Sequence, residues 1–376
     1  MSQLIEALAL AWHPHHIEHL APFCDLLQCP MAILSVDAWH ALSDYPGIVA
    51  LDRRDDKTAA EFLCHDPKAR DDLSSVNLVL YSHLFSRKRL TDIFSFRGSR
   101  PPRVLYCPHG YSEKQQRWSS RAASQDISLF YSSLGLRQLH HWGVRRDLSD
   151  HLVVGNYRHI YLAKHRNFYD THPMVSQLRE ARKRGLIVIV YAPSWDDAIS
   201  TCSISRMLPI LANSPLAGCA LFIKPHPLSS FNHLQEIEDL STQRPNIHLL
   251  RSSLTLPLLE QTDVLIGDMS ALAYDFLRYG RPMIFINGAS GAATDQSKSM
   301  LFECGVIFDA VKHRTIDNVL AEALKAQHRL LPKQRSLDRS IYGATICPDD
   351  LTKRLEHLAL AKPSQWLFTT HSTVQP

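Results

Sequence analysis

The stretch VLIGDMSALAYDF, residues 264–276, decides the fold. Its first half is a short apolar run typical of a buried strand, and its second half has helical spacing, with Ser270 at the turn between them. A strand that passes directly into a helix is the building unit of a parallel α/β sheet. The first N–H groups of such a helix have no intrahelical partner, and the helix dipole favours negative charge there. Ser270 is therefore a candidate phosphate ligand or a plain helix cap.

Short apolar runs alternate with longer amphipathic runs along most of the chain, which predicts parallel sheets with crossover helices. The strands expected in the first half are 7–12, 31–35, 48–51, 76–82, 104–107, 127–131 and 151–154. The strands expected in the second half are 186–191, 219–223, 246–250, 264–266 and 282–286. The helices expected between them include 17–27, 58–64, 136–142, 204–211, 254–260 and 271–279. The sequence thus predicts two Rossmann-like halves.

A polar, basic stretch at 156–184 interrupts this rhythm, and we expect it to be the crossing between domains with one helix. This division predicts an N-terminal domain at 1–155 and a C-terminal domain at 185–345. Residues 346–376 are expected to form a helix and tail that pack back toward the first domain. Ligands of open parallel sheets bind beyond the carboxyl ends of the strands, which is where the polar motifs of this chain fall.

Composition excludes several classes of protein. The 376 residues include 45% hydrophobic ones, enough to bury two cores, so a disordered chain is excluded. A net charge of +4 is too small for a dedicated nucleic-acid binder, although short basic clusters at 87–89 and 182–184 leave room for contact with an acidic membrane surface. The eight cysteines show no zinc-site spacing and suit a reduced cytoplasmic protein. No signal peptide and no membrane-spanning run is expected.

The segment Lys224-Pro-His-Pro227 follows one of the expected strands. The flanking prolines restrict the backbone of His226 and oppose a helix, so the imidazole is expected on a stiff turn at the strand tip. Together with Lys224 it could donate hydrogen bonds or positive charge to a leaving phosphate. A bystander loop histidine is the alternative.

The pair His109-Gly110 occupies the equivalent position after the expected strand 104–107. Gly110 permits an unusual backbone angle or a close approach of substrate. A histidine at this place could accept a proton from an acceptor hydroxyl near neutral pH. From the dipeptide alone, an ordinary turn is an equally good interpretation.

Four further histidines, His13, His15, His16 and His19, look like metal ligands. They lack a matching set of carboxylates or cysteines, so we expect no metal site there. No motif of the chain calls for a divalent metal or a cofactor.

Four motifs occur in this order: His109-Gly110, Tyr191-Ala-Pro-Ser-Trp-Asp196, Lys224-Pro-His-Pro227 and Asp263–Ser270 with the following 274–276 and Arg281-Pro282. From about residue 104 to the carboxyl-terminal helix, the chain thereby resembles the CDP-glycerol glycerophosphotransferases, which include teichoic acid and capsule polymerases. This resemblance implies a GT-B architecture, with an acceptor-side first domain and a second domain that binds a CDP-linked donor.

By the same resemblance, His226 and Ser270 would contact the pyrophosphate and His109 would activate the acceptor hydroxyl. The reaction would be in-line attack on the β-phosphorus with release of CMP. The remaining candidate donor-binding residues are Gly110, Ser194, Trp195, Asp196, Lys224, Asp268 and Asp275. The expected partners are a nucleotide-activated donor and a glycan or lipid-linked acceptor, but no nucleic acid. We expect a cytoplasmic protein, or one peripheral on the cytoplasmic face of the membrane.

Two departures from the family pattern leave alternatives open. Ala271 stands where the family commonly has a second serine, and a small-residue loop at 287–294 replaces an acidic and aromatic segment. A GT-B glycosyltransferase or epimerase that uses a CMP-sugar or UDP-sugar is therefore the second hypothesis. A non-catalytic nucleotide-binding assembly partner is the third.

Overall fold

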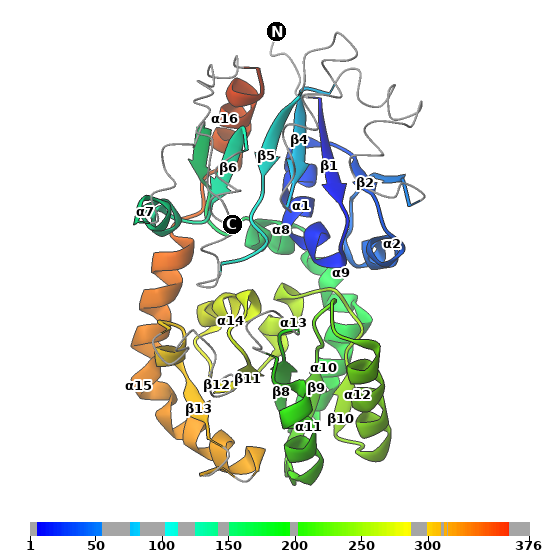
Figure 1. Ribbon diagram of the computed structural model, residues 1–376, viewed down its shortest axis with the longest axis vertical. Helices are drawn as coiled ribbons and strands as arrows, with labels where there is room; N and C mark the ends of the chain where they lie inside the picture. Colours follow the sequence, from blue (N-terminus) through cyan, green and yellow to red (C-terminus); the bar gives the residue numbers. More distant parts are fainter. Residues whose placement is uncertain are drawn as a thin grey trace, which may run out of the picture.

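A computed structural model describes residues 6–54, 76–82, 102–111, 125–141, 150–195, 202–286, 299–309, 312–313 and 315–360. These residues form two α/β domains that follow one another along the long axis of the molecule (Figure 1). Each domain is built on one sheet, and all strand pairs among the described residues are parallel. The predicted fold class, two Rossmann-like domains with parallel sheets, is confirmed.

The N-terminal sheet has seven strands in the order β3-β2-β1-β4-β5-β6-β7. Their bounds are β1 Ala7–Ala11, β2 Met31–Ile33, β3 Ala50–Asp52, β4 Leu78–Tyr81, β5 Arg103–Tyr106, β6 Ile127–Phe130 and β7 Asp150–Val153. Each of them overlaps an expected apolar run, with differences of one or a few residues at the ends. The central strands β1 and β4 are buried along their whole length, as continuous apolar runs require.

The C-terminal sheet has six strands in the order β10-β9-β8-β11-β12-β13. Their bounds are β8 Ile187–Ala192, β9 Cys219–Ile223, β10 Ile247–Leu249, β11 Val264–Gly267, β12 Met283–Ile286 and β13 Val306–Phe308. The sequence analysis did not predict the edge strand β13, although it has the same three-residue length as β2, β3 and β10.

The described helices cover the sheets and connect the domains (Figure 1). Their bounds are α1 Pro14–Leu27, α2 Val36–Ala41, α7 Ser133–His141, α8 Arg158–Lys164, α9 Arg166–Thr171, α10 Pro173–Lys183, α11 Ile204–Asn213, α12 Phe231–Gln243, α13 Leu256–Gln261, α14 Ala271–Phe276, α15 Ile316–Tyr342 and α16 Pro348–Leu360, with 3-10 turns at Leu42–Asp44, Leu277–Tyr279 and Phe302–Cys304. The expected helix 58–64 lies outside the described residues.

Two expectations about helices were wrong. The crossing at 156–184 holds three short helices instead of one, because the chain breaks at His165 and at His172, the latter followed by Pro173 as the first residue of α10. Helix α1 begins at Pro14 rather than at residue 17, so the histidine-rich stretch is its first turn and not a loop. Proline suits the first helical position because its missing N–H would have no intrahelical partner there.

The last two helices return the chain to the first domain. Helix α15 runs along the C-terminal domain, and near its end the carbonyl of Ser340 accepts a hydrogen bond from Ser132 Oγ at 2.6 Å (Figure 1). Helix α16 then packs on the N-terminal domain, where Leu351 and Leu355 are fully buried. The guanidinium of Arg103 donates to the carbonyl of Leu358 at 2.5 Å. The carboxyl-terminal segment thus links both domains.

Both sheets have the strand order of a Rossmann fold. The order reverses between β1 and β4 in the first sheet and between β8 and β11 in the second. Crossover connections leave such a switch point in opposite directions, which opens a crevice at the carboxyl ends of those strands. The segments that follow β1 and β8 are therefore the places where each domain is built to receive a ligand.

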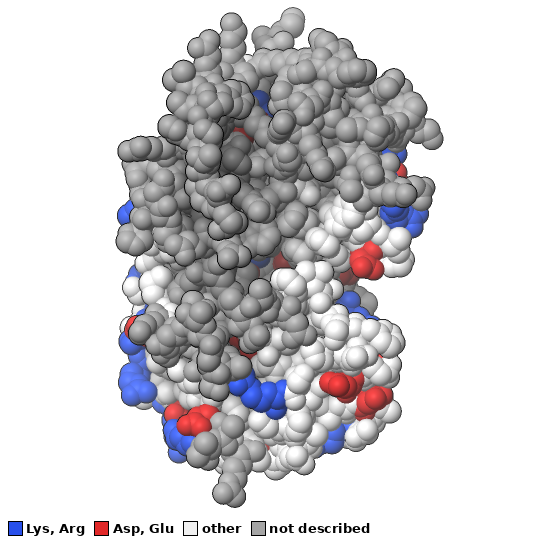
Figure 2. All heavy atoms as spheres, viewed as in Figure 1, with Lys and Arg blue, Asp and Glu red and all other residues white. Residues whose placement is uncertain are grey.

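The described surface carries both signs of charge. On the face shown in Figure 2, Lys and Arg residues are interspersed with Asp and Glu residues wherever the described part of the chain is visible. None of the described helices is long and apolar enough to cross a membrane.

Candidate functional site

Side chains from the carboxyl ends of both sheets meet between the domains. The ring of His15, which follows β1, lies 5.8 Å from the ring of His109 and 6.2 Å from that of His226, measured between centroids. His109 follows β5 and His226 follows β9. We call His13, His15, His16, His109 and His226 the histidine cluster. The two histidines singled out from the sequence are therefore brought to one place, from different domains.

The hydrogen bond of His109 fixes its tautomer. Its Nδ1 lies 2.8 Å from the backbone carbonyl of Ser82, at the end of β4. A carbonyl only accepts, so Nδ1 carries the proton and the neutral ring has its lone pair on Nε2. Burial lowers the pKa of His109, with the nearby His13 acting in the same direction and the Ser82 carbonyl opposing it. The ring is therefore held neutral with Nε2 as a proton acceptor.

His226 has the opposite arrangement. The backbone N–H of Leu228 donates to its Nδ1 at 3.1 Å, which leaves the ring proton of the neutral form on Nε2. The indole of Trp195 is 39% exposed and stacks beside this ring at 6.2 Å between centroids, with an interplanar angle of 27°. His226 is therefore set to donate from Nε2, next to an exposed aromatic face.

Ser270 occupies the N-cap position of α14, at the end of the turn that follows β11, with extended backbone and no side-chain cap bond. Its Oγ is buried, and the described residues offer it no hydrogen-bond partner. The helix cap that the sequence left open as an alternative is thus not formed by this side chain. A buried hydroxyl in this position can donate a hydrogen bond to a bound ligand.

The His109 loop rests directly on α14. Gly110 has a φ of +112°, and a Cβ added to it would come within 2.5 Å of the Ala271 Cβ. Next to it, the rings of Tyr111 and Tyr274 meet edge to face at 4.9 Å. Gly110 is thus needed for close approach of the two domains. Ala271, the departure from the family pattern, lies at that contact.

Asp268 organises the ends of β8 and β11. Its side chain is fully buried, and its Oδ2 accepts from the backbone N–H of Ser194 at 2.8 Å, from Ser194 Oγ at 3.2 Å and from the backbone N–H of Ser203 at 3.2 Å. Burial raises the pKa of Asp268, against these hydrogen bonds. These contacts give Asp268 and Ser194 a structural function at the switch point of the second domain. Asp196 lies outside the described residues.

The side chain of Lys224 is buried and does not lie on the surface. Its Nζ donates to the carbonyl of Ser252 at 3.1 Å. Burial lowers the pKa of this ammonium, and the carboxylates of Glu18 and Asp44 from the first domain oppose that effect. Its role toward a phosphate therefore stays a prediction.

Asp275 of α14 is held by residues of α8 and α15. Arg158 donates to it through both terminal nitrogens, at 2.9 and 2.5 Å, and the hydroxyl of Tyr342 donates to it as well. Arg158 is 4% exposed and Asp275 is 2% exposed. A bidentate pair this deeply buried fixes geometry. We call these two residues the buried ion pair.

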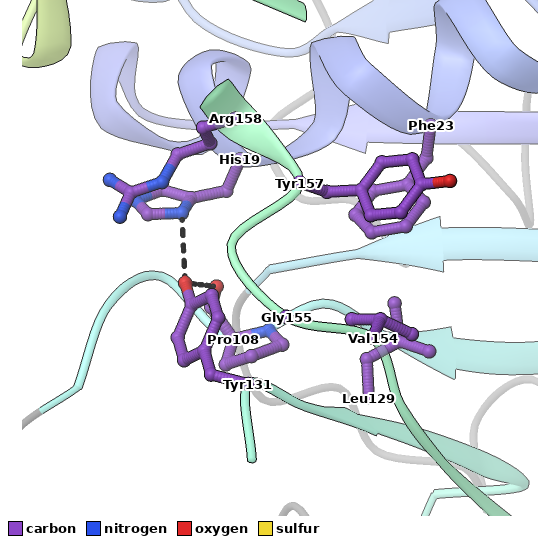
Figure 3. A pocket seen from close by; sticks show the side chains of 9 residues that line it. All are labelled: His19, Phe23, Pro108, Leu129, Tyr131, Val154, Gly155, Tyr157 and Arg158. Atoms are coloured by element: carbon purple, nitrogen blue, oxygen red, sulfur yellow. Dashed lines mark hydrogen bonds between the residues drawn. The ribbon is translucent and has the colours of Figure 1, made fainter. Parts of the chain in front are cut away.

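A small cavity separates the buried ion pair from the His109 loop (Figure 3). Tyr131 stands on its wall, with its hydroxyl donating to the carbonyl of Pro108 at 2.9 Å and lying 3.4 Å from His19 Nδ1. The same hydroxyl accepts the backbone N–H of Gly110 at 3.1 Å. Burial lowers the pKa of His19 well below its ordinary value, and Arg158 adds to that shift. Tyr131 thus anchors the loop that carries His109.

The sequence analysis missed the participation of His13, His15 and His16. Their rings contact one another, and His15 and His16 both reach His109. A signal was present: they follow the first strand of the sheet, where a Rossmann-like domain places its ligand. The described residues contain no group of three or more His, Cys, Asp or Glu side chains that could hold a metal ion.

Comparison with known proteins gives a partial match to one family and a shared fold. Residues 162–291 match the family model of CDP-Glycerol:Poly(glycerophosphate) glycerophosphotransferase. The wall teichoic acid polymerase TagF superposes with a TM-score of 0.57 at 12% identity, over 96% of this chain and 90% of that one. A TagF histidine variant soaked with CDPG gives 0.59 at 11% identity, over 94% and 88%.

Two other solved structures share the architecture. The Anabaena protein Alr3699/HepE in complex with UDP-glucose has a TM-score of 0.53 at 13% identity, over 94% of this chain and 98% of that one. A candidate UDP-N-acetylglucosamine 2-epimerase from Listeria monocytogenes gives 0.59 at 12% identity, over 96% and 98%. The sequence search against curated proteins found no match. At these identities the structural likeness establishes the GT-B-like fold alone, and the similarity to the family model is limited to residues 162–291.

The predicted resemblance is therefore confirmed by the family model over residues 162–291, and the predicted GT-B-like fold is confirmed over nearly the whole chain.

Proposed function

We propose that this enzyme transfers a polyol phosphate, glycerol phosphate or ribitol phosphate, from a CDP-linked donor to a hydroxyl of a glycan or lipid-linked acceptor. The observation that carries the proposal is the pair of opposite histidine tautomers between the domains. His109 presents a proton acceptor and His226 presents a proton donor. Phosphoryl transfer to a hydroxyl needs both, one for the nucleophile and one for the leaving group.

On the donor side, the pyrophosphate would lie at the carboxyl ends of β9 and β11. Nε2–H of His226 and the buried hydroxyl of Ser270 would donate to its oxygens. The exposed indole of Trp195 beside His226 offers a flat surface on which a base or a polyol can pack. Asp268 would act indirectly, by holding the segment around Ser194.

On the acceptor side, Nε2 of His109 would take the proton of the attacking hydroxyl. The acceptor oxygen would form a bond to the β-phosphorus while the bond between that phosphorus and the bridging oxygen breaks, and CMP would leave with the bonding electrons. Because burial keeps the pKa of His109 below its ordinary range, the base remains unprotonated at neutral pH. Positioning and charge stabilisation would supply most of the rate enhancement.

No step of this reaction needs a cofactor, and the proposal involves none. The product would be an extended cell-surface polymer such as a teichoic acid or a capsule polysaccharide. Work on a lipid-linked acceptor would place the protein at the cytoplasmic face of the membrane as a peripheral protein. The basic residues at 182–184 at the end of α10 are candidates for such a contact.

The test is a ligand panel read by thermal shift, with CDP-glycerol, CDP-ribitol, CMP-sugars and UDP-sugars at equal concentration. A ligand that binds the native state raises Tm in proportion to the logarithm of its concentration over Kd. We expect a CDP-polyol to give the largest shift and His226→Ala to reduce it. A shift confined to UDP-sugars would replace the proposal with a sugar-nucleotide enzyme on the same fold.

A further inference from the structure

We propose that His15 is a further catalytic residue, which contacts the β-phosphate of the bound nucleotide donor from the acceptor-side domain. The identity of the nucleotide rests on the proposed function. The contact itself does not, since any nucleoside diphosphate donor carries a β-phosphate at this point. The proposal names a role for the histidine-rich first turn of α1, which the donor and base assignments leave unused.

The position of His15 carries the inference. Its ring lies within about one phosphate's reach of both His109 and His226, at centroid distances of 5.8 and 6.2 Å. Hydrogen bonds of about 2.9 Å from two rings at such a separation can converge on one phosphate group. The group between the base and the leaving-group donor is the one that is transferred. His15 therefore borders the reacting phosphorus.

The fold holds this ring firmly. Pro14 starts the helix, and the backbone N–H groups of Trp12 and His13 both point to Nδ1 of His16, at 3.4 Å each. The ring of His13 stacks on that of His15 at 5.4 Å with an interplanar angle of 8°, and the ring of His16 meets it edge-on at 4.6 Å. Packing on two sides restricts the side chain of His15, so little freedom is lost when it binds a ligand.

The strand order supports the same role. His15 follows β1 at the switch point of the first sheet, and Ser194 and Ser270 follow β8 and β11 at the switch point of the second. Each crevice receives a ligand from its own side. Where two switch points face each other, a group moving from donor to acceptor passes between them. An imidazole at that boundary can donate to the non-bridging oxygens, whose charge grows in the transition state.

The experiment compares CMP with CDP, which differ by the β-phosphate alone. Isothermal titration calorimetry would measure Kd of CMP, CDP, UMP and UDP for the wild type, His15→Ala, His15→Asn and His328→Ala. Loss of a hydrogen bond to a charged group weakens binding by about 10-fold to 100-fold. We expect His15→Ala to lose this factor for the diphosphate and under about 2-fold for the monophosphate, with His15→Asn in between because its amide still donates.

His328 is the matched control, an exposed histidine on the surface of α15. Its substitution should change no Kd. Unfolding temperature of each variant shows whether a loss of affinity comes from a loss of fold. An equal loss of monophosphate and diphosphate affinity, or an unchanged ratio of the two in His15→Ala, would overturn the inference while leaving the donor assignment intact.

Binding of UMP and UDP without binding of CMP and CDP would bear on the donor instead of on His15. It would overturn the proposed CDP-linked donor, and the ratio of UDP to UMP affinity would then decide the role of His15. Absence of binding by all four nucleotides would overturn both.

Discussion

The two domains touch in two chemically different places, and the contrast explains how this molecule divides stability from function. At the histidine cluster, polar rings from both sheets face one another beside the exposed indole of Trp195. At the buried ion pair, Arg158 and Asp275 are almost completely enclosed and hydrogen-bonded to each other. The first place holds the residues to which we assign the proposed chemistry. The second uses its hydrogen-bonding capacity within the protein and sets how the domains are oriented.

Substitution of His109 should give the largest effect, and it should act on activity alone. Removal of a general base lowers kcat/KM by about 10²-fold to 10⁴-fold. Steady-state release of CMP from CDP-glycerol by His109→Ala, in the presence of acceptor, measures it. The unfolding temperature should change much less than the activity, because the proposed role of this ring is chemical and its hydrogen bond to Ser82 serves to orient it. A variant with full activity would remove His109 from the mechanism.

Substitution of Asp275 should have the reverse profile. Asp275→Ala leaves the Arg158 guanidinium buried without its carboxylate, which costs about 3–5 kcal/mol of unfolding free energy. Urea denaturation followed by circular dichroism measures the change. Arg251→Ala is the matched control, since the ion pair of Arg251 with Glu238 is solvent-exposed and such pairs contribute about 0–1 kcal/mol. Equal losses of unfolding free energy in the two variants would refute the distinction between the buried ion pair and an ordinary surface ion pair.

Substitution of Gly110 tests whether the His109 loop must lie close to α14. A Cβ at this position meets both an unfavourable backbone angle and the Ala271 side chain, whereas Gly185 has a φ of +77° with nothing within 4 Å. Gly185→Ala should therefore cost about 1 kcal/mol for the left-handed backbone alone. Gly110→Ala should cost more and also lower kcat, because it pushes the His109 loop away from α14. Identical thermal stability and activity in the two variants would show that the domains do not need this contact.

The smallest expected effect is the pH dependence of kcat/KM, which reports on His109 in the histidine cluster and not on the buried ion pair. Burial lowers the pKa of His109 below 6.5, so kcat/KM should remain high at pH 7 and fall only as the pH drops through that lowered pKa. The folded state then also binds fewer protons than the unfolded state, so stability weakens as the pH falls below 6.5. An acid limb centred at or above 6.5 would contradict the assignment of this base.

The sequence predicted the parts of the molecule that follow from local pattern. Apolar runs predicted twelve of the strands, since burial on both faces makes a parallel strand continuously apolar. The position of His109 and His226 after strands predicted where their side chains gather. The tautomers were not predictable, because each depends on one backbone group, the Ser82 carbonyl and the Leu228 N–H.

Contacts between distant segments account for what was missed. The sequence context of Asp275 does not reveal its pairing with Arg158, 117 residues away along the chain. The spacing of His13, His15 and His16 in the sequence does not indicate that His15 and His16 contact His109. Their contact with His109 depends on how β1 and β5 lie in the sheet, with β4 between them. Such proximity comes from topology and not from spacing.

The most direct test of the account is a crystal structure of the His109→Ala variant with CDP-glycerol, which binds the donor but turns it over slowly. The account predicts the pyrophosphate between the domains, within hydrogen-bond distance of Nε2 of His226 and of the Ser270 hydroxyl, with the β-phosphorus next to the vacated place of the His109 ring. A nucleotide bound away from the carboxyl ends of β9 and β11, or a CDP-glycerol that does not bind at all, would contradict it.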